Sequence, residues 1–113
     1  MVDNDESVRA ALAGVLGSAG FNVVALPSVY QFIGKGAVDD HACILVDIEV
    51  PGLEFLNRHL SSSRKRPLIV LSASDKRSMR RKARELGAVS FFSKPVDDRA
   101  LIDAIVRATE SAS

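Results

Sequence analysis

The 113-residue chain contains a single cysteine, few aromatic residues and no long apolar run. One cysteine excludes an internal disulfide framework, so nothing points to an oxidising compartment. The longest uninterrupted apolar run has about five residues, whereas a membrane-spanning helix needs about 20. No basic segment followed by a long apolar core opens the chain, as a secretory signal would. These absences predict a soluble, cytoplasmic protein.

The length and the charge of the chain narrow the class further. The length suits one domain over residues 1–113, large enough to hold a core without metal or disulfide staples. Fifteen basic and fourteen acidic residues give a net charge of +1, which provides no overall attraction to nucleic acid or to a membrane. The basic residues are unevenly placed, because nine of them lie between Arg64 and Arg84, where Asp75 is the one acid.

Short apolar runs alternate with longer stretches of helical period, a pattern typical of a parallel sheet with helices on both faces. Three of the runs are nearly continuous in Val, Ile, Leu or Phe, as expected of strands buried on both sides. The predicted strands are residues 1–2, 21–26, 42–46, 68–71 and 89–92.

Four apolar stripes at helical spacing fall between and after these runs, and a short helix is predicted after Pro27-Ser28. Gly20 and Gly87 are predicted to end the first and third striped helices, and Asp97 is a candidate N-cap for the last. The stripes are Val8, Leu12, Val15 and Ala19; Leu53, Leu56 and Leu60; Met79, Ala83 and Leu86; and Leu101, Ile102, Ile105 and Ala108.

Polar side chains follow four of the predicted strands at the point where each strand ends. Asp3, Asp47, Ser72 and Lys94 hold these positions. In a parallel α/β sheet, ligands bind outside the carboxyl ends of the strands, so we expect these groups to share one crevice. Carboxylates suit Mg²⁺, and a lysine with a serine suits a phosphoryl group.

At these positions the sequence resembles the response-regulator receiver domain, the CheY-like phosphoacceptor module of two-component signalling. The resemblance covers nearly the whole chain, and it implies a five-stranded parallel sheet of (βα)5 type with strand order 2-1-3-4-5. The motifs are DNDESVR at 3–9, CILVD at 43–47 followed by Pro51-Gly52, Ser72-Ala73, and Gly87-Ala88 through to Lys94-Pro95.

The resemblance implies a role for each matching residue. Asp47 would accept a phosphoryl group from the phosphohistidine of a sensor histidine kinase or of a phosphotransfer protein. Lys94 would pair with the phosphoryl oxygens, and Ser72 would hydrogen-bond one of them after transfer. Phe91 matches the aromatic position whose rotamer reports the switch. Such a domain is not a turnover enzyme.

The implied Mg²⁺ site consists of Asp3 acting through water, Asp47 and the backbone carbonyl of Glu49. Asn4 stands where the family has the second acid of a pair, which predicts weakened metal binding. The loop after Gly52 is shorter than in the family, and so is the first strand. The short first strand indicates either a start upstream of Met1 or a degraded domain.

Two further classes of function remain open. The substitution at Asn4 and the shortened loop favour a pseudo-receiver, which uses the same fold as a phosphorylation-independent interaction module. A small flavodoxin-like or phosphatase-like enzyme is disfavoured, because no cap domain fits into this length and no loop suited to a flavin phosphate follows the first strand.

Each site residue also has a plainer interpretation. Asp47 could cap the loop after its strand, and Lys94-Pro95 could form a simple turn. Glu6 suits a helix start whether or not a metal is present. Cys43 is interpreted as a small core residue, and Phe91 could serve packing alone.

Partner surfaces are predicted over residues 75–110. Arg81 and Arg84 lie beside an apolar stripe, and the last helix carries Asp98, Asp103 and Glu110. These charges predict a weak, salt-sensitive homodimer, because exposed ion pairs are individually weak and are screened by salt. Nucleic acid is the disfavoured rival partner, and no membrane partner is expected. The chain could be a stand-alone receiver or one cut from a longer regulator.

Overall fold

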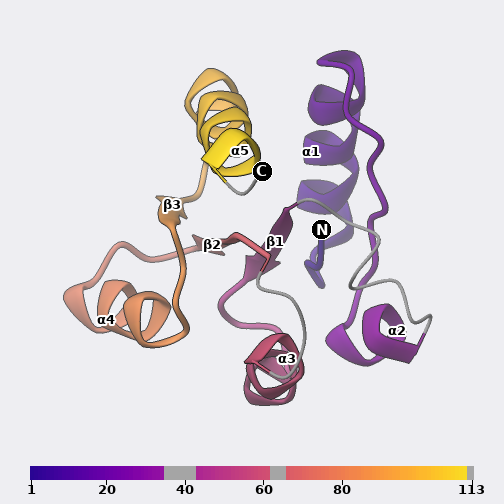
Figure 1. The fold of residues 1–113 in the computed structure, drawn as a ribbon. Helices are drawn as coiled ribbons and strands as arrows, with labels where there is room; N and C mark the ends of the chain where they lie inside the picture. The colour runs from indigo at the N-terminus through magenta and orange to yellow at the C-terminus, as the bar shows by residue number, and fades with distance from the viewer. Residues whose placement is uncertain (35–42, 62–65, 112–113) are drawn as a thin grey trace.

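The structure is a computed structural model that describes residues 1–34, 43–61 and 66–111. Within these ranges the chain forms five helices and three strands around a central sheet (Figure 1). In chain order the elements are α1 (Glu6–Ser18), α2 (Val29–Gly34), β1 (Ile44–Asp47), α3 (Leu53–Ser61), β2 (Leu68–Ser72), α4 (Arg77–Glu85), β3 (Ser90–Ser93) and α5 (Asp98–Ser111).

The three strands form a parallel sheet in the order β1-β2-β3. They correspond to the third, fourth and fifth predicted strands, each within two residues of its predicted bounds; Ala42, the predicted start of the third, lies outside the described residues. In the register, Ile44 pairs with Leu68 and Ile69 pairs with Ser90. The predicted α/β class with a parallel sheet is therefore confirmed.

The first two predicted strands are reduced to single bridges. Val2 makes one parallel bridge to Leu26 and another to Val46, so its backbone lies between the ends of the runs 21–26 and 42–46. Within the described residues neither 1–2 nor 21–26 forms a ladder, because a strand needs consecutive paired residues on one partner. The prediction of a five-stranded sheet with a shortened first strand is thus not confirmed, and strand order 2-1-3-4-5 stays a prediction.

The helix limits follow the local signals in the sequence. Asp97 caps α5 as predicted, because its Oδ1 accepts a hydrogen bond from the backbone N–H of Ala100 at 2.8 Å. Helices α1 and α4 each end two residues before the predicted stop glycine. The short helix predicted after Pro27-Ser28 is α2, where Ser28 Oγ accepts from the N–H of Gln31 at 3.1 Å.

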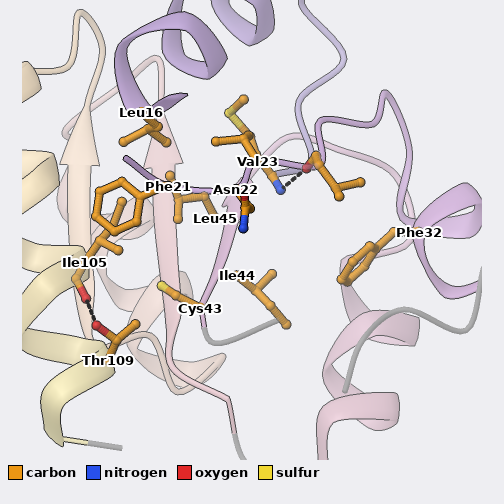
Figure 2. A pocket seen from close by; sticks show the side chains of 12 residues that line it. Leu16, Phe21, Asn22, Val23, Phe32, Cys43, Ile44, Leu45, Ile105 and Thr109 are labelled. Carbon is orange, nitrogen blue, oxygen red and sulfur yellow. Dashed lines mark hydrogen bonds between the residues drawn. The ribbon is translucent and has the colours of Figure 1, made fainter. Parts of the chain in front are cut away.

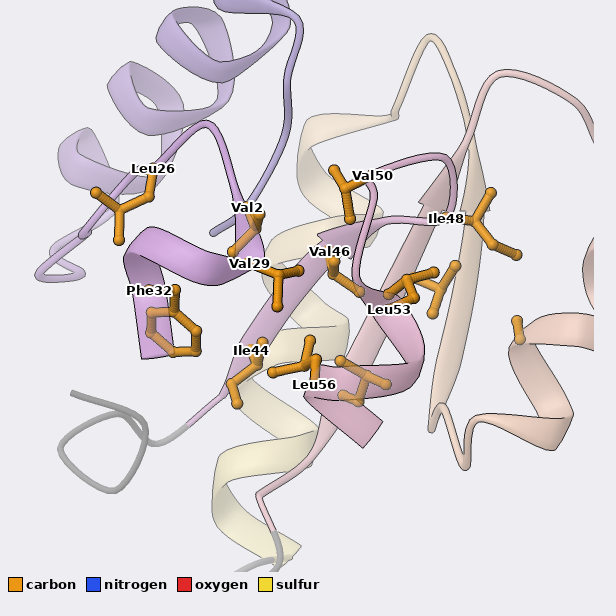
Figure 3. Packing of buried hydrophobic residues seen from close by; sticks show 13 residues of the cluster. Val2, Leu26, Val29, Phe32, Ile44, Val46, Ile48, Val50, Leu53 and Leu56 are labelled. Atoms are coloured by element: carbon orange, nitrogen blue, oxygen red, sulfur yellow. The ribbon is translucent and has the colours of Figure 1, made fainter. Parts of the chain in front are cut away.

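The core consists of two clusters on opposite faces of the sheet, as the period-two alternation of strand residues requires. Figure 1 shows α2, α3 and α4 on one face and α1 and α5 on the other. Ile44 and Val46 point to the first face, where Phe32 of α2 and Leu56 of α3 pack (Figure 3). The second face holds Leu45, Ile69, Leu71, Leu12, Leu16, Leu101 and Ile105.

Candidate functional site

Two carboxylates and one ammonium meet at the carboxyl-end edge of the sheet. Asp47 is the last residue of β1, Asp3 follows the bridge at Val2, and Lys94 follows β3. Lys94 Nζ lies 2.8 Å from Asp3 Oδ2 and also donates a hydrogen bond to Asp47 Oδ2. The structure thus brings together three of the side chains that the sequence placed at this edge.

The carboxylates of this cluster are buried. Asp3 is 0% exposed and Asp47 is 5% exposed, while the side chain of Lys94 is 16% exposed. Buried carboxylates need compensation by charge and by hydrogen bonds, because removal from water strongly disfavours an isolated charge. One ammonium shared by two carboxylates gives these three side chains together one negative charge in excess.

Backbone N–H groups hold the other oxygen of each carboxylate. Asp3 Oδ1 accepts from the N–H of Asp5 at 2.9 Å, and Asp47 Oδ1 accepts from the N–H of Glu49 at 2.7 Å. Both contacts are local turns in which an Asp side chain caps the backbone two residues on. A carboxylate offers about four acceptor positions, so each one keeps capacity for a further ligand.

The charge state of Lys94 follows from these contacts. Burial lowers the pKa of its ammonium. The hydrogen bonds and charges of Asp3 and Asp47 raise the pKa by more than burial lowers it, so the pKa of Lys94 lies above the usual lysine value. Lys94 is therefore protonated at neutral pH. The backbone N–H of Lys94 also donates to the carbonyl of Ser72 at 2.7 Å, which ties the end of β3 to the end of β2. The Lys94-Pro95 peptide bond is cis.

Ser72 is fully buried at the end of β2, but its hydroxyl turns toward its own loop. Its Oγ donates to the carbonyl of Ser74 at 2.6 Å and accepts from the N–H of Ser74 at 3.1 Å. The residue lies at the predicted edge, yet in this structure its hydroxyl is engaged with Ser74 instead of the acidic pair. A bond from the hydroxyl to a phosphoryl oxygen would require the donated bond to Ser74 to break.

The predicted metal ligands are only partly gathered. Among the residues in the described ranges, no group of three or more His, Cys, Asp and Glu side chains comes together. Asn4 and Glu49 are exposed, and the buried carboxylates at this edge are Asp3 and Asp47. Two buried carboxylates with spare acceptor capacity still fit Mg²⁺, which is usually held by one or two carboxylates together with water and substrate phosphate.

Phe91 lies in β3 under a cation from the neighbouring helix. The Cζ atom of Arg80 is 4.8 Å from the centroid of the Phe91 ring, within the range of a cation–π interaction. The half-buried ring also packs against the first core cluster. Its role as a switch stays a prediction.

Two contacts at the site were not anticipated. Arg9 Nη1 donates to the backbone carbonyl of Asp3 at 2.7 Å, and Arg80 covers Phe91. Arg9 lies one helical turn after the N-cap Asp5, and this spacing could have indicated a return contact to the preceding loop. Arg80 belongs to the basic run between Arg64 and Arg84, and the charge of that run does not indicate which of its side chains contacts an aromatic ring.

A separate cavity of about 120 Å³ lies at the opposite end of β1, between the sheet and α1 and α5. Its lining is mainly apolar and includes Leu16, Phe21, Cys43 and Ile105 (Figure 2). Burial raises the pKa of the Cys43 thiol to about 11, so the thiolate is scarce at neutral pH. This agrees with the interpretation of Cys43 as a packing residue.

No helix in the described part of the chain is long and apolar enough to span a membrane.

Comparison with known proteins agrees with this geometry. Residues 1–106 match the family of response regulator receiver domains. Nodulation protein W of Bradyrhizobium diazoefficiens is 34% identical over 113 residues, covering 97% of this chain and 50% of that protein. The transcriptional regulatory protein FixJ of Azorhizobium caulinodans is 33% identical over 108 residues, covering 93% and 51%. The chain therefore spans about half the length of these curated relatives.

Solved structures share the fold. A CheY-like response regulator receiver domain protein from Methanospirillum hungatei JF-1 superposes with a TM-score of 0.85 at 20% identity, covering 98% of this chain and 91% of that one. The response regulator StyR superposes with a TM-score of 0.84 at 32% identity, covering 98% and 58%. The predicted CheY-like α/β fold is thus confirmed, and the chain belongs to the family of response regulator receiver domains of two-component signalling.

Proposed function

We propose that this domain accepts a phosphoryl group on Asp47. The observation that carries the proposal is a buried carboxylate at the end of β1, fixed by the N–H of Glu49 and neutralised by Lys94. An Asp47 oxygen would attack the phosphorus of a phosphohistidine, forming an acyl phosphate as the P–N bond breaks and the imidazole leaves with its electron pair. The donor would be a sensor histidine kinase or a phosphotransfer protein.

Charge compensation is the main task of the surrounding residues. The anionic phosphoryl group approaches an edge that already carries two carboxylates, so positive charge must offset the repulsion. Lys94 supplies one positive charge, and its ammonium would pair with the phosphoryl oxygens after transfer. Ser72 would then donate its hydroxyl hydrogen to the phosphoryl group in place of Ser74.

We propose that Mg²⁺ assists the transfer. Asp3, Asp47, the carbonyl of Glu49 and the amide of Asn4 would hold the ion. A divalent ion stabilises charge on the transferring phosphoryl group as a Lewis acid. Asn4 contributes a dipole in place of a full charge, so the affinity for the metal should be reduced.

We expect the domain to act as a signalling module and not as a turnover enzyme. Formation of the acyl phosphate would change the surface of the domain, and that change would carry the signal. The bridges of Val2 to Leu26 and Val46 support the strand order 2-1-3-4-5, with the first and second strands reduced to single bridges. The relatives named as transcriptional regulatory proteins are about twice as long, which supports the proposal that this receiver controls a separate output domain.

The test is phosphorylation by a small-molecule acyl phosphate donor, followed by intact-mass spectrometry. We expect one phosphoryl adduct that depends on Mg²⁺ and is absent in Asp47→Asn. Asp98→Asn, an exposed carboxylate on α5, is the matched control and should be labelled like the wild type. Absence of any adduct would favour a pseudo-receiver, for which the uncharged, exposed Asn4 is the specific support.

A further inference from the structure

The segment that follows Asp47 is held tightly at its start. Asp47 accepts two backbone hydrogen bonds from this segment, one from Glu49 to its side chain at 2.7 Å and one from Val50 to its carbonyl at 3.2 Å. Val50 and Leu53 are buried in the first core cluster (Figure 3). Of the two residues between them, Pro51 is exposed and Gly52 is half-buried.

An aromatic ring from another helix covers Gly52. A Cβ atom at Gly52 would lie 3.0 Å from Tyr30 Cζ and 3.2 Å from the Tyr30 hydroxyl oxygen, so the ring occupies the space that a side chain would fill. Gly52 also has a φ of 89°, which L side chains rarely adopt. Its carbonyl accepts from the N–H of Leu56 at 3.0 Å, so α3 starts directly at this point.

Tyr30 bridges the loop and α3 at once. Its ring centroid lies 5.8 Å from that of Phe55 in a tilted arrangement, a favourable geometry for aromatic pairs. Tyr30 as a whole is nevertheless 58% exposed, so its burial contributes little to the core. Tyr30 comes from α2 on the first face of the sheet, and its contacts with Gly52 and Phe55 lie on the short segment that begins at Asp47.

We propose that Tyr30 is a positioning residue for phosphorylation: its ring clamps Gly52 and thereby fixes the loop that orients Asp47 and the carbonyl of Glu49. The proposal rests on the function proposed above. Between Asp47 and Gly52 only four residues intervene, and Val50 among them donates to the carbonyl of Asp47 at 3.2 Å, so a shift at Gly52 would reach Glu49 and Asp47 through Val50. A small misplacement of reacting groups is enough to slow a reaction substantially.

The test compares Tyr30→Ala and Tyr30→Phe with the control Val89→Ala. Val89 is an apolar residue with the same 58% exposure as Tyr30, and it precedes β3 at the opposite edge of the sheet. In Tyr30→Ala we expect the maximal rate of Mg²⁺-dependent phosphorylation to fall about threefold to tenfold. The half-saturating donor concentration should not change, because Tyr30 does not reach Asp47. Tyr30→Phe keeps the ring on Gly52 and should restore the rate.

A second readout does not depend on phosphorylation. Amide hydrogen exchange, measured by NMR, should be faster at Glu49 and Val50 in Tyr30→Ala than in wild type, with β2 amides unchanged as the check on folding. If wild type forms no adduct, the proposed function fails and the role of Tyr30 fails with it. If wild type is labelled and Tyr30→Ala is labelled equally fast, or if Glu49 and Val50 exchange at wild-type rates, only the role of Tyr30 is overturned.

Discussion

Removal of the Lys94 ammonium should be among the most destabilising single changes at the site. Lys94→Met keeps most of the side-chain volume but leaves Asp3 and Asp47 buried at 0% and 5% exposure without their shared cation. Breaking a buried ion pair by removing one partner typically costs about 3–5 kcal/mol. Against a total stability of about 5–15 kcal/mol, this is a large fraction of the free energy of unfolding.

Urea unfolding followed by circular dichroism measures this loss. With a slope of about 1.5 kcal/mol/M, in the lower half of the usual range of about 1–3 kcal/mol/M for urea, the midpoint should fall by about 2–3 M. Lys82→Met is the matched control, because Lys82 is exposed and surface substitutions usually change stability by less than about 0.5 kcal/mol.

The double variant Asp3→Asn/Lys94→Met isolates the physical cause. Removing one of the two uncompensated charges should recover part of the stability lost in Lys94→Met. Added Mg²⁺ should raise the midpoint of Lys94→Met more than that of wild type, because a divalent ion replaces the missing positive charge. A loss below about 1 kcal/mol in Lys94→Met, as for a surface ion pair, would refute the idea that the ammonium balances two buried carboxylates.

Three further predictions concern metal, pH and association. Asn4→Asp should bind Mg²⁺ more tightly by calorimetry and be less stable without metal, because a third carboxylate then crowds the site; unchanged affinity would mean that residue 4 does not face the metal. The pKa of Lys94 in the folded protein lies above its ordinary value of 10.5. Its stabilising effect is therefore complete below that pH and is lost as the pH rises through the folded pKa. The difference in unfolding free energy between wild type and Lys94→Met should be constant near neutrality and shrink above about pH 10.5. Any self-association, measured by analytical ultracentrifugation, should weaken with salt and in Arg81→Glu/Arg84→Glu, and indifference to both would exclude the basic helix as the contact.

The arrangement of strand ends could be predicted because it follows from hydrophobic patterning. Buried apolar runs ending in Asp47 and Ser72 fix which residues reach the edge of a parallel sheet, and the structure places both there. The fate of Ser72 could not be predicted in the same way. Its hydroxyl can bond either to a ligand or to its own backbone, and sequence spacing does not distinguish a side chain facing the site from one that closes the turn to Ser74.

The extent of the first two predicted strands and the long-range contacts could not be predicted, for a different reason. The run 21–26 has strand composition, but a ladder also needs a partner, and Val2 supplies only single pairs to Leu26 and Val46. The contact of Tyr30 with Gly52 joins segments that are adjacent only in the folded protein. Neither pairing partners nor such contacts follow from local periodicity.

The most direct measurement of the central claim is chemical identification of the residue that carries the phosphoryl group. Borohydride reduces an acyl phosphate on aspartate to homoserine, which peptide sequencing by mass spectrometry locates. After treatment with a small-molecule phosphodonor and Mg²⁺, we expect homoserine at position 47 and unmodified aspartate at positions 3 and 5. Homoserine elsewhere, or none at position 47 in protein that carries a phosphoryl adduct, would contradict the assignment of Asp47 as the phosphoacceptor.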